Sequence, residues 1–201
     1  MSWRVVVRDA MNDELLVDAE NGLVSGEVAI RGFDPPVVTP PGSSRVLNLF
    51  VRRDRFDVPP RSIVQFSVSG TPVFWGPAVV VPPSGSPGAG PFDEDRDAIE
   101  RVTVVGGEQL LRDSIVLERL LEETLDVSAI AFELCDLYAH PALTVTEANF
   151  VTTGSVLEVF YKPESTLYHA LQTLVDSVPG GATSWVDASG AIHFQAHATS
   201  S

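Results

Sequence analysis

Two alternating apolar segments, Ile63 to Val68 and Thr71 to Trp75, are separated only by the pair Ser69-Gly70. Such a two-residue link predicts a β-hairpin, because glycine adopts the positive φ that tight hairpin turns need. The simplest register opposes residue 68 to 71, 66 to 73 and 64 to 75. In that register one face of the hairpin is apolar and comprises Val64, Phe66, Val68, Thr71, Val73 and Trp75. The hairpin therefore predicts a sheet with one face turned to a core.

Pro72 constrains that sheet further, because its nitrogen carries no hydrogen to donate to a ladder. It predicts either a sheet edge or a bulge at this point of the hairpin. Further alternating segments at 3–7, 46–51 and 101–105 predict more strands of the same kind. Roughly six short strands and no long helix precede Gly106, which favours a small antiparallel barrel or sandwich. We expect an N-terminal antiparallel β-barrel.

The pattern changes after Leu110. The spacing of Val116, Leu120, Leu121 and Leu125 predicts a helix. A second helix is expected to begin at Asp126 or Ser128 as N-cap, to bury Ile130, Leu134 and Leu137, and to end before Pro141. A third helix is expected to be capped by Ser165 and to bury one face that comprises Leu167, Leu171, Leu174 and Val178. Segments 184–187 and 191–194 predict a closing hairpin.

These elements predict an α+β fold, with the β-barrel followed by a small α/β domain. We place the ring-forming barrel domain at 1–111, with an extended loop at 82–92, and the α/β domain at 112–201. The segment from Pro82 to Pro91 holds four prolines, three glycines, two serines and one alanine, so it is expected to be extended or mobile. The assembly-loop candidates within it are Pro82, Pro83, Pro87 and Pro91.

Charge is distributed unevenly along the 201 residues, whose formal net charge is −14. From Ile63 onward 18 acidic residues stand against 5 basic ones. This balance argues against a protein that grips nucleic acid, because phosphate contacts need lysine and arginine. A run of acids follows the extended loop and comprises Asp93, Glu94, Asp95 and Asp97. Runs of like charge are usually solvated linkers, and the alternative is that these four line a passage.

No group of residues forms a strong catalytic, cofactor or metal signal, so we expect neither an enzyme nor a bound cofactor. His193 and His197 could share a metal, but no third ligand is evident. Gly106-Gly107 follows a strand without the spacing of a phosphate-binding loop. Cys135 is alone and is expected to be a buried thiol. No run approaches the roughly 20 apolar residues of a membrane span, and no secretory leader is evident.

The order of these segments resembles the first half of the baseplate hub proteins of phage tails and contractile injection systems. Segment 70–76 reads G-T-P-V-F-W-G, segment 102–106 reads V-T-V-V-G, and segment 185–194 reads W-V-D-A-S-G-A-I-H-F. In that family a strand with the pattern G-x-x-V-F-x-G leaves a barrel, and a later hairpin closes an α/β domain. Arg61-Ser62 stands where many such proteins carry Gly-Asp before the first hairpin strand.

The resemblance implies a structural protein of the tail tip, assembled in the host cytoplasm, that forms a ring at the end of the tail tube and joins tube to tip. Its implied partners are distal tail or tube proteins, a second hub polypeptide and fibre or tip proteins. DNA would pass without being bound specifically, and the acids from Asp93 to Asp97 would face that lumen. Two other functions stay open: a β-rich glycan-binding module that uses Trp75 or Trp185, and a fragment of a tail-associated hydrolase.

The family usually continues into a second barrel, and two barrels per subunit let a trimer present sixfold symmetry. One barrel per chain would need either six copies of this chain or three copies each of two polypeptides. We favour the second arrangement, a hetero-oligomeric ring over a homohexamer, because the α/β portion resembles the part that packs against the remaining half in the longer proteins.

Overall fold

The computed structural model describes residues 3–20, 29–31, 46–52, 58, 61–80, 99–121 and 124–197. The chain divides into two compact units, Met1–Gly106 and Gly107–Ser201. The domain boundary expected after Leu111 falls inside a helix of the second unit. The mixture of sheet and helix agrees with the α+β class expected from the sequence.

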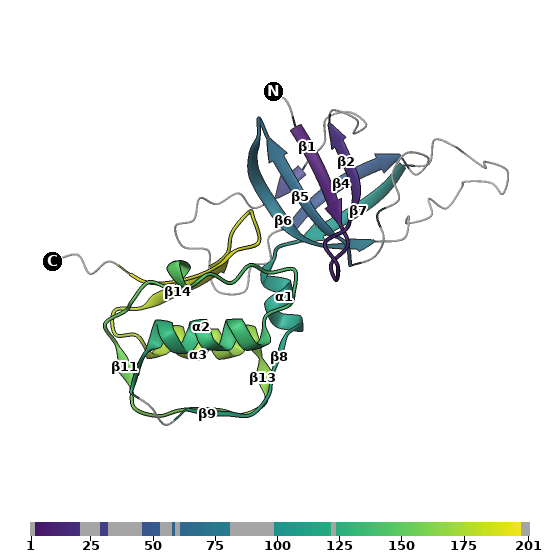
Figure 1. Ribbon diagram of the computed structural model, residues 1–201. Helices are drawn as coiled ribbons and strands as arrows, with labels where there is room; N and C mark the ends of the chain where they lie inside the picture. Colours follow the sequence, from purple (N-terminus) through teal and green to yellow (C-terminus); the bar gives the residue numbers. More distant parts are fainter. Residues whose placement is uncertain are drawn as a thin grey trace. The chain divides into compact units, whose positions relative to one another are not determined.

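All seven strands described in the first unit belong to one antiparallel sheet (Figure 1). They are β1 (Trp3–Arg8), β2 (Leu15–Glu20), β3 (Ala29–Arg31), β4 (Val46–Arg52), β5 (Ile63–Val68), β6 (Thr71–Val80) and β7 (Ile99–Val105). Their order in the sheet is β2-β1-β5-β6-β7-β4-β3. Within the described residues no ladder joins β2 to β3, so closure of the sheet into a barrel stays a prediction.

The β5–β6 hairpin has the expected turn but a different register. Ser69 and Gly70 have φ of 50° and 81°, as a type I′ turn requires. Val68 faces Thr71 as predicted, but a bulge follows, and Phe66 faces Phe74 instead of Val73. The extra residue lies next to Pro72, which agrees with the limit that proline places on a ladder.

The bulge also corrects the expected apolar face. Beyond it, Trp75 lies opposite Gln65 instead of Val64, whose partner is Gly76. Because neighbouring residues of a strand point to opposite faces, this shift of one residue moves Trp75 off the face that carries Val64. Phe74 takes its place in the core.

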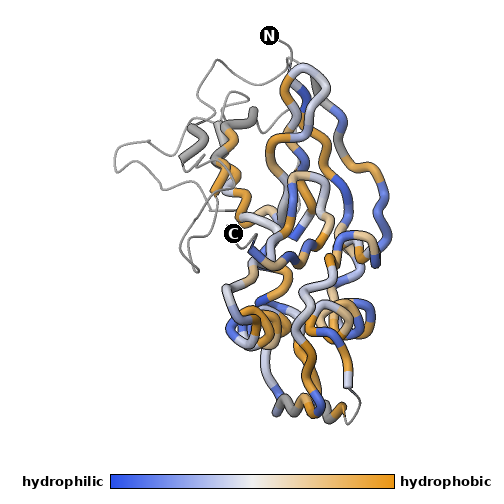
Figure 2. Tube along the Cα trace, turned by 90° about the vertical axis from the view of Figure 1, so that its left-hand side faces the viewer, coloured by the Kyte–Doolittle hydropathy of each residue, from blue (hydrophilic) through white to orange (hydrophobic). Residues whose placement is uncertain are grey.

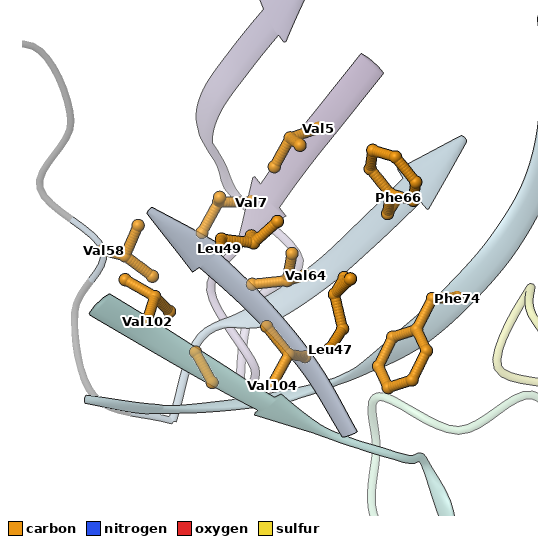
Figure 3. Close-up of a cluster of buried hydrophobic side chains, with 11 residues drawn as sticks. Val5, Val7, Leu47, Leu49, Val58, Val64, Phe66, Phe74, Val102 and Val104 are labelled. Carbon is orange, nitrogen blue, oxygen red and sulfur yellow. The ribbon is translucent and has the colours of Figure 1, made fainter. Parts of the chain in front are cut away.

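One core joins β1 and β5, near one end of the sheet order, to β4 and β7, near the other. Figure 3 shows side chains of β1 and β5 facing those of β4 and β7. The buried cluster comprises Val5, Val7, Leu47, Leu49, Val58, Val64, Phe66, Phe74, Ala78, Val102 and Val104. Apolar and polar residues alternate along the strands, as Figure 2 shows for this unit. The sheet is therefore curled so that its inner face encloses a single core.

Two backbone positions of this unit have special requirements. Gly76 lies so close to β7 that a Cβ there would stand 1.8 Å from the carbonyl oxygen of Val105. Arg61 has a φ of 71°, a conformation in which glycine is favoured. Its N–H donates to the carbonyl of Ala78 (3.1 Å), and the N–H of Ala78 donates to that of Ser62 (2.7 Å). The tight turn before β5 is thus present without a glycine.

The second unit packs helices against short strand pairs (Figure 1). Its helices are α1 (Glu108–Asp113), α2 (Val127–Tyr138), α3 (Leu167–Ser177) and a 3-10 turn, η1 (Glu147–Asn149). Its strands are β8 (Ile115–Val116), β9 (Arg119–Leu121), β10 (Leu125–Asp126), β11 (Val156–Leu157), β12 (Phe160–Lys162), β13 (Ser165–Thr166), β14 (Ala182–Val186) and β15 (Ile192–Ala196). No helix among the described residues is long and apolar enough to span a membrane.

The helix expected from Val116 to Leu125 is wrong. This segment holds β8, β9 and β10, which pair with β13, β12 and β11 to form an interrupted two-stranded ribbon. We call residues 115–126 and 156–166 the edge ribbon. Val116 is fully buried and Leu125 half-buried, so their apolar character reflects strand packing in this unit.

The other two helices occur where the sequence predicts them. Asp126 caps α2, and Thr166, one residue after the expected Ser165, caps α3 by accepting from the N–H of His169 (3.2 Å). Within α2, Leu134 is fully buried as expected, whereas Leu137 is 53% exposed. The first helix, α1, joins α3 through Arg112, whose guanidinium lies 3.7 Å from the ring centroid of Tyr168.

The closing hairpin of β14 and β15 is confirmed, with Val186 opposite Ile192. Segment 144–150 runs beside β15, with parallel bridges from Thr144 to Ala191 and from Phe150 to Phe194. The fully buried side chain of Phe194 anchors the hairpin in the core of this unit.

Candidate functional site

The sequence assigns assembly and lumen roles to Pro82, Pro83, Pro87, Pro91, Asp93, Glu94, Asp95 and Asp97. All eight lie outside the described residues, so both assignments stay predictions. The structure does place the strands on either side of them. Val80 of β6 pairs with Val102 of β7 in an antiparallel ladder, so the segment between these strands starts and finishes at the same end of one ladder.

Asp187 forms a hydrogen-bonded cluster at the turn of the β14–β15 hairpin. Its Oδ1 accepts from the N–H (2.8 Å) and hydroxyl (2.7 Å) of Ser189 and from the N–H of Ala191 (3.0 Å). Its Oδ2 lies 2.9 Å from Nε2 of His193. Burial alone would raise the pKa of Asp187, but the hydrogen bonds from Ser189 and His193 outweigh it and lower the pKa to about 2. The carboxylate is therefore ionised and fixes the turn.

The two tryptophans considered for glycan stacking lie in different surroundings. Trp75 is 9% exposed, so its ring offers little surface to a sugar. Trp185 is half-buried, and the ring of His193 stacks on it with centroids 4.8 Å apart and planes 7° from parallel. His193 thereby covers one ring face of Trp185 while its Nε2 contacts Asp187.

His193 and His197, considered as a metal pair, have separate partners. His193 is held by Asp187, whereas Nε2 of His197 lies 2.6 Å from the hydroxyl of Thr183. The N–H of His197 donates to the carbonyl of Gly181 (3.0 Å), above which its ring is packed. The described part of the chain holds no group of three side chains suited to a metal ion.

Asp126 forms a second cluster of the same kind. Its Oδ1 accepts from the N–H (2.9 Å) and hydroxyl (2.7 Å) of Ser128 and from the N–H of Thr153 (3.1 Å), and its Oδ2 accepts from the N–H of Gly154 (2.9 Å). Burial opposes ionisation, but the hydrogen bonds from Ser128 and Thr153 lower the pKa of Asp126. This side chain caps α2 and ties the loop before β11 to it.

Both clusters share the sequence Asp-x-Ser, at 126–128 and 187–189. The short aspartate side chain accepts from the backbone two residues on, which is the geometry of an Asx turn. The N-cap role of Asp126 is among the predictions from the sequence, whereas its link to Thr153 and Gly154 and the whole Asp187 cluster are not. The repeated Asp-x-Ser signal could have indicated the second turn.

Several other polar side chains of the chain are buried or lie in turns. Cys135 is fully buried as expected, and burial raises the pKa of its thiol to about 12. Nδ1 of His140 accepts from the N–H of Ala142 (3.1 Å) in the turn after α2. Among the described residues the buried polar side chains are three serines, at 62, 114 and 128.

No protein-family model and no curated protein matches this chain. Among the solved structures that it resembles are two tail proteins. The prophage MuSo2 43 kDa tail protein from Shewanella oneidensis matches with a TM-score of 0.50 and 10% identity, over 96% of this chain and 49% of that one. The tail protein from Neisseria meningitidis MC58 matches with a TM-score of 0.46 and 15% identity, over 96% of this chain and 50% of that one.

At 10% identity the Shewanella likeness is one of fold. It extends over both units of this chain. The order of the first unit and the second unit is therefore common to the two proteins. The chain spans about half the length of each of these two tail proteins.

Proposed function

We propose that this chain is a structural component of a phage tail, in the hub at the tail tip or baseplate. The observation that supports the proposal best is the fold shared with the Shewanella prophage tail protein across 96% of the chain. The short motifs at 70–76, 102–106 and 185–194 agree with it, because the structure places each one in a hairpin or at a strand end.

The first unit is the ring-forming part in this proposal. Its sheet is curled around one core. A small closed barrel likewise needs an interior that is filled with side chains. Ring neighbours would be copies of this chain or a second hub polypeptide, in a trimeric or hexameric arrangement. Tube or distal tail proteins would lie on one side of the ring, and tip or fibre proteins on the other.

The segment between β6 and β7 is the proposed assembly loop. The strands on its two sides, β6 and β7, are neighbours in the same sheet. A partner bound to the loop would therefore be connected to that sheet through both strands. The acids from Asp93 to Asp97 would border the lumen, where like charge keeps DNA from adhering to the wall. The proposal gives the chain no catalytic step.

The proposal is tested by deleting the gene in frame in the strain that produces the particle and imaging the particles by electron microscopy. We expect the deletion strain to produce phage heads and tail-tube fragments that lack an attached tip. Complete particles should return when the gene is supplied in trans. Complete, infective particles from the deletion strain would overturn the proposal.

The hub position is tested separately by co-expression with the polypeptide of the downstream gene, followed by native mass spectrometry. An equimolar complex supports a hub that is divided between two chains. A stable homohexamer that ignores the neighbour argues for a ring of this chain alone.

A further inference from the structure

His193 contacts two other side chains of the closing hairpin at once. Its Nε2 lies 2.9 Å from Oδ2 of Asp187, and its ring stacks on that of Trp185 with centroids 4.8 Å apart. The side chains of His193 and Asp187 are 24% and 35% exposed, so solvent and salt screen their contact only in part. A change of charge on His193 is therefore felt by both neighbours.

The contact with Asp187 fixes which nitrogen of His193 carries the hydrogen. The pKa of Asp187 is about 2, so above about pH 4 its carboxylate is ionised and can only accept a hydrogen bond. Nε2 must therefore be the donor, in the neutral ring as well as in the charged one. A proton taken up by the ring goes to Nδ1 and leaves the hydrogen bond to Asp187 in place.

Protonation of His193 changes both contacts in the same direction. A hydrogen bond to a carboxylate is roughly twice as strong from a charged donor as from a neutral one. A cation within about 6 Å of the centroid of an indole ring is also attracted to the ring face, and the two rings here are closer than that. The charged ring thus holds Asp187 and Trp185 more firmly than the neutral ring does.

The surroundings of the strand offer no cation that would oppose this charge. The elements that pack against β15 are β14, α2 and η1, and none of them contains lysine or arginine. His193 alternates with the buried Ile192 and Phe194 and so points to the opposite face of the hairpin. The titratable side chains on α2 and η1 are Glu133, Cys135, Asp136, Tyr138 and Glu147, and β14 has none.

We propose that His193 is a pH-sensitive contact that stabilises the β14–β15 hairpin when its ring is charged. Imidazole groups change charge between about pH 5 and 8, a range in which Asp187 stays ionised. The added stability is therefore present at the acidic end of this range and is lost as the pH rises through it. The proposal concerns the second unit alone and does not rest on the proposed place in a tail.

The test measures hydrogen exchange of the full chain by mass spectrometry at about pH 5.5 and about pH 7.5. Each exchange rate is compared with the intrinsic rate of an unfolded peptide at the same pH. We expect amides at 182–196 to be protected about fivefold more strongly at the lower pH. The first unit is an internal control, because all four histidines lie in the second unit. Protection of β5 should change by less than about twofold.

Three substitutions separate His193 from the other histidines. His193→Gln keeps an N–H that can donate to Asp187 but cannot take up a proton. Asp187→Asn keeps an acceptor but removes the negative charge. His197→Gln is the matched control at the end of the same strand, because its Nε2 contacts the hydroxyl of Thr183 and not a carboxylate. The pH difference at 182–196 should disappear in the first variant, fall below about twofold in the second and remain in the third.

Nitrogen NMR of the histidine side chains tests the same proposal on the unsubstituted chain, and it decides the matter if the His193→Gln variant does not fold. We expect Nδ1 of His193 to lose its proton as the pH rises, while Nε2 keeps its hydrogen. Loss of the hydrogen from Nε2 would overturn the proposal. So would equal protection of 182–196 at the two pH values, or a pH difference that survives in His193→Gln or vanishes in His197→Gln.

Discussion

In the first unit seven strands form one sheet, whereas the eight strands of the second unit pair only two by two within the described residues. The sheet unit brings residues distant in sequence, such as Val5 and Leu49, into a single core. The helical unit instead holds its short pieces with carboxylates, Asp126 and Asp187, that bind nearby backbone N–H groups. We therefore expect different substitutions to destabilise the two units. The first unit should be sensitive to changes in close backbone contacts and in the volume of its core. The second should be sensitive also to the loss of polar contacts in its turns.

The largest effect is expected from Gly76→Ala in the first unit. The new Cβ would lie 1.8 Å from the carbonyl oxygen of Val105, so β6 and β7 would have to separate. We expect a loss of more than about 4 kcal/mol in the free energy of unfolding, measured by urea denaturation. Gly70→Ala is the control, because nothing lies within 4 Å of that position and only its φ of 81° is strained. It should cost about 1 kcal/mol. Equal losses would refute the close-approach argument.

The next effect belongs to the helical core of the second unit. Leu134→Ala removes a fully buried side chain of α2 and should cost about 3 kcal/mol. Leu137→Ala on the same helix removes a side chain that is 53% exposed and should change stability by less than about 0.5 kcal/mol. Hydrogen exchange followed by mass spectrometry measures the loss in each unit separately. If the two variants behave alike, the burial assigned to this face of α2 is wrong.

A smaller effect, found only in the second unit, is expected from Asp187. Because its folded pKa of about 2 lies below the usual 3.8, its charged contacts stabilise the hairpin above about pH 4. That contribution is lost as the pH falls toward 2. Asp187→Asn should cost about 1 kcal/mol at neutral pH and flatten the pH dependence of exchange at 182–196. Asp176→Asn, at an exposed position of α3, is the control. An unchanged pH profile in Asp187→Asn would contradict this account.

The smallest effect is a gain. Arg61 holds a φ of 71° without being glycine, so Arg61→Gly relieves strain in the first unit and should add about 0.5 kcal/mol. Arg61→Ala keeps the strain and should add nothing. A rise in melting temperature for both variants would show that the arginine side chain, and not the backbone, is the source of the gain.

The accuracy of prediction from sequence follows the range of the interactions involved. Local signals were sufficient for the Ser69-Gly70 turn, for the N-cap at Asp126 and for the buried face of α3. The register beyond Phe66 was not predictable in this way, because the bulge depends on how β6 must fit both β5 and β7.

The mistaken helix at 116–125 has a similar cause. Strands of two or three residues are too short to display a period of two, and their apolar residues happen to recur at helical spacing. Their conformation is decided by partners about forty to fifty residues further along the chain, such as Ser165 for Val116 and Tyr161 for Leu120. The candidate site was predictable only in part for the same reason, since the link from Asp126 to Gly154 is also non-local.

Cys135 gives the experimenter a practical advantage. It is the only cysteine in the chain, it is fully buried, and its thiol has a pKa of about 12. A maleimide reacts with thiolate, so this residue should stay unlabelled while the protein is folded. A single cysteine introduced at an exposed position such as Val159 would then carry one dye at a known place, without removal of the native residue. The same chain can thus report on its own assembly by fluorescence, with the buried thiol becoming reactive only when α2 unfolds.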